Sequence, residues 1–130
     1  MKKKLNKLFI LLIIAILAAL VGIYLKVMPK YVGRDNLVNK INSSYPVQFC
    51  NVIYPHIATC VTFTASQCQD IAKPQIAACV AADTSIPSVL TSDDAQKRYE
   101  SYSKCFATKM HELILQKYVV QTPQCEKTLS

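Results

Sequence analysis

Six cysteines and two histidines are the residues of this chain whose side chains offer the most direct chemistry. Thiols form disulfides, bind metal ions together with histidine, or act as a redox pair. A thioredoxin-type redox pair needs a Cys-x-x-Cys spacing, and a zinc-protease helix needs His-Glu-x-x-His. Neither motif occurs, since His111-Glu112 lacks the second histidine. The pattern therefore predicts structural disulfides and no metal, no cofactor and no catalytic residue.

Four of the cysteines lie in a stretch that nearly repeats itself, with Pro55–Val61 resembling Pro74–Val80. The two copies predict an antiparallel helical hairpin that turns near Thr64-Ala65. Facing positions in such a hairpin have a constant sum of residue numbers, and two cysteine pairs have sums that differ by only one. The third pair follows by elimination, although six cysteines allow many other connectivities. The predicted bridges are Cys50–Cys79, Cys60–Cys68 and Cys105–Cys125.

The helices that carry these cysteines have recognisable ends. Pro55 and Pro74 suit the first position of a helix, so each half of the hairpin is predicted to begin at its proline. Thr91-Ser-Asp-Asp94 is a capping-box start for a longer helix, and Pro123 is expected to end any helix before it. That longer helix has an apolar stripe, which is expected to form core over the hairpin or, alternatively, an interface. The stripe consists of Tyr99, Tyr102, Phe106, Met110 and Leu113.

The N-terminal part differs in character from the rest of the chain. Leu8–Leu25 has no charged residue and is almost wholly apolar, and as a helix it would rise about 27 Å, close to the thickness of a hydrocarbon core. No Ala-x-Ala site precedes its end, which favours a retained signal-anchor over a cleaved signal peptide. The predicted parts are a cytoplasmic Lys-rich tail and transmembrane anchor over 1–27, a tether with a short helix over 28–48, and a cysteine-stapled domain over 49–130.

The net charge of +7 does not indicate nucleic-acid binding. Four lysines that precede the apolar run carry +4 of it, and the remaining chain has an ordinary excess of +3. Basic residues on the last long helix alternate with acidic ones, as on a solvated helix face. No nucleic-acid partner is therefore expected.

The sequence predicts an all-α protein: a transmembrane helix, a small disulfide-stapled helical hairpin and a C-terminal amphipathic helix. Persistent disulfides require an oxidising compartment, which places the cysteine-rich domain in the periplasm and the anchor in a bacterial inner membrane. Because it has a predicted anchor and no catalytic motif, the chain is predicted to be a non-catalytic accessory subunit of an envelope assembly, such as a secretion or transport complex. Its expected partners are the lipid bilayer and an unidentified envelope protein. The alternative function is a small redox or metal-handling protein with one reactive cysteine pair.

Overall fold

The computed structural model describes residues 14–19 and 31–130. The chain divides into two compact units, Met1–Lys30 and Tyr31–Ser130. In the first unit, residues 14–19 are helical. None of the described helices is both long enough and apolar enough to cross a membrane. The predicted span Leu8–Leu25 lies largely outside the described residues.

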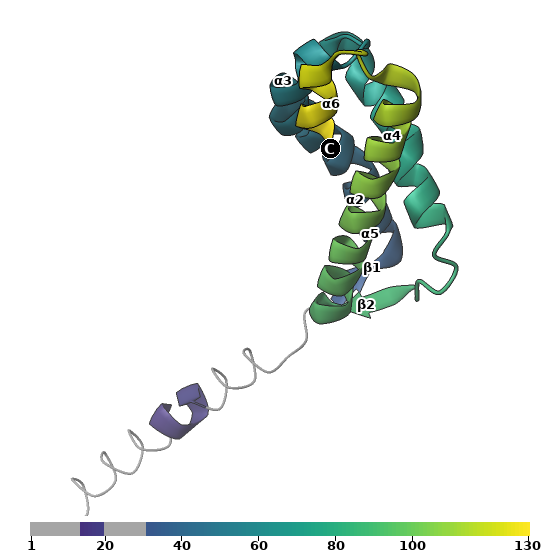
Figure 1. The fold of residues 1–130 in the computed structure, drawn as a ribbon. Helices are drawn as coiled ribbons and strands as arrows, with labels where there is room; N and C mark the ends of the chain where they lie inside the picture. The colour runs from purple at the N-terminus through teal and green to yellow at the C-terminus, as the bar shows by residue number, and fades with distance from the viewer. Residues whose placement is uncertain (1–13, 20–30) are drawn as a thin grey trace, which may run out of the picture. The chain divides into compact units, whose positions relative to one another are not determined.

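The second unit is mostly helical, in agreement with the predicted fold class, and contains one short sheet (Figure 1). Two π-helical turns, Phe49–Ile53 and Ile114–Tyr118, follow α2 and α5, and a 3₁₀ turn, Ala58–Cys60, follows α3. The named elements are β1 Tyr31–Gly33, α2 Arg34–Gln48, α3 Tyr54–Ile57, α4 Ala65–Ala81, β2 Val89–Thr91, α5 Ser92–Leu113 and α6 Pro123–Leu129.

The two-stranded antiparallel sheet was not predicted. Its register pairs Val32 with Leu90, and each strand leads directly into a helix, β1 into α2 and β2 into α5. The sheet therefore joins the N-terminal ends of these two helices, which leave it side by side in the same direction (Figure 1). Leu90 is almost fully buried and anchors the sheet to the core. Strands of three residues carry too little alternation to be recognised in a sequence.

Helix α4 is the central element of the domain, since it packs against both α2 and α5. It runs opposite to both of them (Figure 1), so a helical hairpin is present as predicted, but its first arm is α2 and not the segment that begins at Pro55. Small side chains such as Ala72, which is fully buried, let the neighbouring helices approach closely. The buried residues of α4 recur at helical spacing: Cys68, Ala72, Ile76, Cys79 and Val80.

Pro74 does not begin its helix, contrary to the prediction. Helix α4 begins at Ala65, where Thr64 and Gln67 form a capping box in which the Gln67 side chain accepts a hydrogen bond from the Thr64 backbone N–H at 3.0 Å. Pro74 consequently lies inside the helix. Packing before and after this position offsets the missing backbone hydrogen bond. Pro55, in contrast, lies at the start of α3 as predicted.

The segment predicted as a tether belongs to the domain from Tyr31 onward. Helix α2 spans fifteen residues and buries Leu37, Ile41 and Tyr45 in the core. Pro46 is buried inside the helix. Leu37 and Ile41 lie on one face of α2, and this face belongs to the core because α4 packs beside it.

All six cysteines form disulfides, but none of the predicted pairs occurs. The bridges are Cys50–Cys68, Cys60–Cys125 and Cys79–Cys105. The prediction failed because it paired both α4 cysteines with one neighbouring segment. Instead, Cys68 joins α4 to the π turn after α2, whereas Cys79 joins it to α5.

Cys60 is turned away from α4 by backbone pairing with the C-terminal segment. Thr62 N–H donates to Tyr118 C=O at 2.8 Å, and Val120 N–H donates to Cys60 C=O at 2.9 Å. This pairing brings Cys60 to Cys125 across a sequence separation of 65 residues. Closing so long a loop in the unfolded chain contributes about 4 kcal/mol, against about 3 kcal/mol for Cys50–Cys68.

The position of the short helix α6 also differs from the prediction. Pro123 begins this helix instead of ending one, since the Thr122 hydroxyl caps it by accepting a hydrogen bond from Cys125 N–H at 3.3 Å. The start of α5 is as predicted, because Thr91 caps it through Asp94 N–H at 3.2 Å.

We predict that non-reducing peptide mapping of the purified chain recovers Cys50–Cys68, Cys60–Cys125 and Cys79–Cys105, with no free thiol. The mapping requires cleavage between Cys68 and Cys79 of α4, for example on the N-terminal side of Asp70 by an Asp-specific protease. Recovery of Cys50 linked to Cys79 would restore the simple hairpin pairing and contradict the arrangement of α4 between two partners.

Phe106→Ala is expected to lower the free energy of unfolding by about 3 to 5 kcal/mol, because it empties a site that is 5% exposed. Thermal melts of the fragment from residue 28 to residue 130 measure the change. Lys104→Ala, an exposed substitution on the same helix, serves as the control and should shift stability by at most about 0.5 kcal/mol. An unchanged midpoint for Phe106→Ala would remove this residue from the core.

Candidate functional site

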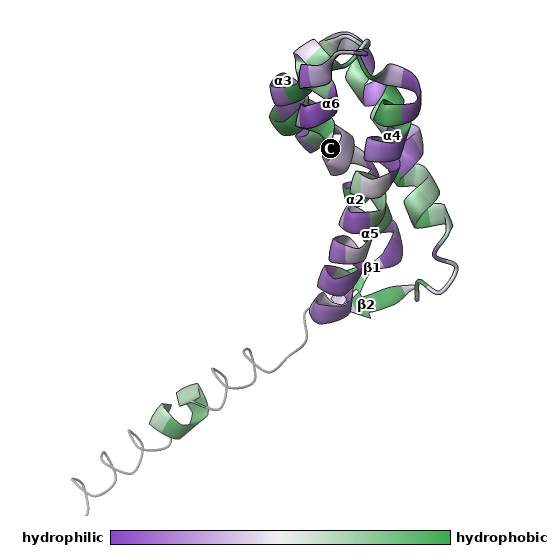
Figure 2. Cartoon of the chain, viewed as in Figure 1, coloured by the Kyte–Doolittle hydropathy of each residue, from purple (hydrophilic) through white to green (hydrophobic). Residues whose placement is uncertain are grey.

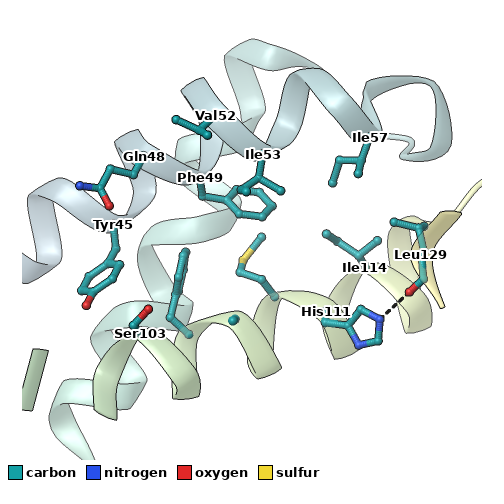
Figure 3. A pocket seen from close by; sticks show the side chains of 13 residues that line it. Tyr45, Gln48, Phe49, Val52, Ile53, Ile57, Ser103, His111, Ile114 and Leu129 are labelled. Atoms are coloured by element: carbon teal, nitrogen blue, oxygen red, sulfur yellow. Dashed lines mark hydrogen bonds between the residues drawn. The ribbon is translucent and has the colours of Figure 1, made fainter. Parts of the chain in front are cut away.

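An open apolar trough of about 450 Å³ lies between two helical walls of the second unit (Figure 3). One wall runs from the end of α2 through the π turn to α3, and the other is α5 with the residue after it. Helix α4 packs against both walls and contributes no lining residue. The lining consists of Tyr45, Gln48, Phe49, Val52, Ile53, Ile57, Ser103, Phe106, Ala107, Met110, His111, Ile114 and Leu129.

The first wall keeps one face toward the trough because of its π turn. In an unbroken α-helix, Ile57 would lie about 120° around the axis from Tyr45. A π turn inserts one extra residue, which reduces this offset to about 20°. Tyr45, Phe49 and Ile57 therefore line the same trough. Figure 3 shows Tyr45 near one end and Ile57 near the other.

Two aromatic contacts fix the floor of the trough between the walls. The ring centroids of Tyr45 and Phe106 lie 5.7 Å apart, and Phe49 meets Phe106 edge-on at 6.0 Å. Tyr45 also donates a hydrogen bond to the Tyr99 carbonyl at 2.6 Å. Burial, and after it the neighbouring Tyr99, raises the pKa of Tyr45 to about 12. Tyr45 is consequently neutral throughout the physiological range.

One end of the trough is closed by the chain's own C-terminal helix. Leu129 of α6 is 9% exposed and lines the trough, and the backbone carbonyl of Leu129 accepts a hydrogen bond from His111 Nε2 at 2.6 Å. The Cys60–Cys125 bridge holds α6 in this position. His111 therefore has a structural partner here.

The trough carries no formally charged side chain. None of its lining residues is Asp, Glu, Lys or Arg, and the sequence has none of these from Ile41 to Gln69. Figure 2 shows hydrophobic residues gathered around α3. At the rim, Val52 is 59% exposed and Ile53 is 46% exposed. Large apolar side chains exposed beside an apolar concavity are typical of a binding surface.

The predicted stripe on α5 is divided between core and trough. Tyr102 is buried on the core side, and Phe106 and Met110 are buried side chains that also form the trough floor. Tyr99 is partly buried against the core. Leu113 is only partly buried, and Ile114, at 3% exposure, takes the last position of the stripe. The stripe is thus mainly core, as expected, and Phe106 and Met110 of it also line the trough.

The opposite wall was missed in the sequence, although it had two signals. Apolar residues from Tyr45 to Ile57 recur at intervals of three or four, and the surrounding stretch has no charge. The helical spacing was masked by Pro46 and Pro55, which suggest breaks where the chain continues in helical turns.

A cluster of polar side chains surrounds Asp83, at the hydroxyl end of Tyr102. The Tyr102 hydroxyl donates to Asp83 Oδ2 at 2.6 Å, the Ser85 hydroxyl donates to Oδ1 at 2.7 Å, and Arg98 forms an ion pair with the same carboxylate. The hydrogen bond from Tyr102, followed by those from Ser85 and Arg98, holds the pKa of Asp83 well below its usual range. This cluster fixes the loop between α4 and β2 onto α5.

Within the described residues, no group of three or more His, Cys, Asp or Glu side chains could hold a metal ion. The cysteines at all six positions are bonded to each other, and His111 contacts α6. No family model, curated protein or solved structure matches the chain.

We expect Asp83 to make the domain acid-sensitive. A carboxylate whose folded-state pKa is depressed stabilises the fold above its unfolded value of 3.8 and loses that contribution as the pH falls below it. Thermal midpoints measured from about pH 5 down to about pH 2 should therefore fall more steeply for wild type than for Asp83→Asn.

Asp70→Asn is the matched control, because the Asp70 side chain is 83% exposed and has only a surface ion pair with Lys73. This variant should follow the wild-type profile. Identical slopes for wild type and Asp83→Asn would show that the Tyr102 and Arg98 contacts do not stabilise the charged form of Asp83.

Proposed function

We propose that this protein is a membrane-anchored, non-catalytic binding protein of a bacterial cell-envelope assembly, such as a secretion or transport complex. Leu8–Leu25 serves as the retained anchor, and the disulfide-bonded domain lies in the periplasm. The uncharged trough between α2–α3 and α5 binds the partner. This trough is the observation that carries the proposal, because it is a preformed apolar concavity of the size usual for ligand and partner sites.

The disulfides support an extracytoplasmic location. All six cysteines of the described domain are bonded in pairs, and such bonds persist in oxidising compartments. Each bridge also includes at least one cysteine that is no more than 6% exposed, namely Cys60, Cys68, Cys79 or Cys125. Limited access slows thiol–disulfide exchange, which favours structural bridges over the alternative of a redox role.

A rigid scaffold also favours a binding function over a function that requires a conformational change. The three bridges link α4 to both walls and α6 to the turn after α3, so the walls of the trough are held relative to each other before any partner arrives. Preorganisation of this kind lowers the entropy cost of binding.

The proposal predicts that the full-length chain stays in carbonate-washed membranes and that a partner co-purifies with it. Intact mass spectrometry should find the apolar segment retained. Ala107→Lys, which places a charge at an exposed trough position, should remove the partner without lowering the thermal midpoint.

Two controls separate anchoring from binding. Leu12→Asp combined with Leu17→Asp should release the chain from membranes, because charged residues within a span are costly. Ala77→Lys makes the same change as Ala107→Lys at an exposed alanine of α4 outside the trough and should keep the partner. A shortened product beginning near Leu20 in the soluble fraction would refute the anchor. Equal partner recovery with Ala107→Lys would refute the trough as the binding surface.

A further inference from the structure

We infer that the trough is the docking site for one amphipathic helix of a partner protein, whose inserted face is apolar and uncharged over about three turns. This inference rests on the proposed function only in assuming that the domain binds a protein.

The two walls have the geometry that a third helix needs. Along α5, Ser103, Ala107 and Met110 follow each other at intervals of three or four residues, and Tyr45, Phe49 and Val52 do the same on the opposite wall. Residues of this spacing form a stripe along one face of a helix, and such a stripe is the face through which a helix packs against another helix. Both walls also pack against α4, which leaves the trough side of each as the face still open to a further helix. An added helix would continue the same packing on that side.

The open side of the trough favours a helix over a lipid chain. Val52 and Ile53 at the rim are 59% and 46% exposed, and Ala107 in the other wall is also exposed. An acyl chain lying there would keep much of its apolar surface in water, because it has no polar side. An amphipathic helix buries one face and leaves its polar face to the solvent.

The lining specifies the chemistry of the inserted face. A charged side chain entering the trough would lose its hydration without meeting an opposite charge, because no lining residue is Asp, Glu, Lys or Arg. The accessible part of the lining is supplied by Phe49, which is partly buried, and by Val52 and Ile53, which are exposed apolar side chains. The inserted residues are therefore large aliphatic or aromatic side chains.

The length of the docked segment follows from the ends of the trough. The wall from Tyr45 to Ile57 rises about 18 Å along its helical turns, which corresponds to about three turns of a partner helix. Beyond Ile57 the trough meets Leu129, which the His111 hydrogen bond and the Cys60–Cys125 bridge hold in place. Helix α6 thus sets one end of the site.

The test uses the full chain as it is recovered, in lipid nanodiscs if from membranes and in buffer if not, so that loss of the anchor does not prevent it. The probe is a fluorescent helical peptide of about 14 residues with leucines three and four positions apart on one face and Gln, Ala and Lys on the other. A peptide of the same composition with this spacing scrambled is the negative control, and palmitate is the competing acyl probe.

We expect saturable binding of the patterned peptide and binding weaker by about tenfold or more for the scrambled one. Ala107→Lys on one wall and Gln48→Lys on the other should each weaken the patterned peptide by about tenfold, whereas Ala77→Lys on α4 should leave it unchanged. Thermal midpoints of all variants, compared with wild type, show whether a loss of binding is a loss of folding.

Three outcomes would overturn the inference. The first is equal binding of the patterned and scrambled peptides, or none. The second is palmitate binding that is abolished by the wall variants while the peptide fails to bind, which would make the site a lipid site. The third is a dimer of the chain that Ala107→Lys dissociates, which would make a second copy the occupant. Each result leaves the anchoring and co-purification tests of the proposed function unaffected.

Discussion

Helix α4 packs against α2 on one side and against α5 on the other, and these two contacts hold both walls of the trough. Its buried residues are mostly small, so packing alone provides limited apolar area. Cys68 and Cys79 add a covalent bond in each direction, to the turn after α2 and to α5. Because both walls are held by α4, a trough can remain open between them without collapsing.

The parts of the fold that were predictable depend on local chemistry. The start of α5 at Thr91 was correct because a threonine and an acidic residue three positions later satisfy a helix terminus by themselves. Helical content and disulfide formation also follow from local pattern and composition. The bridges themselves could not be predicted, since Cys60 reaches Cys125 only through strand-like pairing with residues near Tyr118. Such pairing is a long-range property, and six cysteines alone leave it undetermined.

Only one wall of the candidate site could be predicted from the sequence, for a similar reason. The α5 stripe has a strong helical period and was found, except that its last member is Ile114 and not Leu113. The other wall changes from α-helix to π turn and back, so no single period fits it. Prolines normally mark breaks in a helix, and here Pro46 and Pro55 lie within a nearly continuous helical path. A run without charges, from Ile41 to Gln69, was the signal that remained readable.

Phe106 and Met110 would connect folding with the proposed binding, because the same side chains are buried in the core and form the floor of the trough. Substituting them would alter stability and affinity together, so they cannot separate the two roles. Substitutions of Gln48 and Ala107 at the rim can separate the two roles, because both residues are exposed in the domain and contribute little to its core. A binding surface built on a core that also needs three disulfides would lose its walls on reduction, so recognition through this trough would be confined to an oxidising compartment.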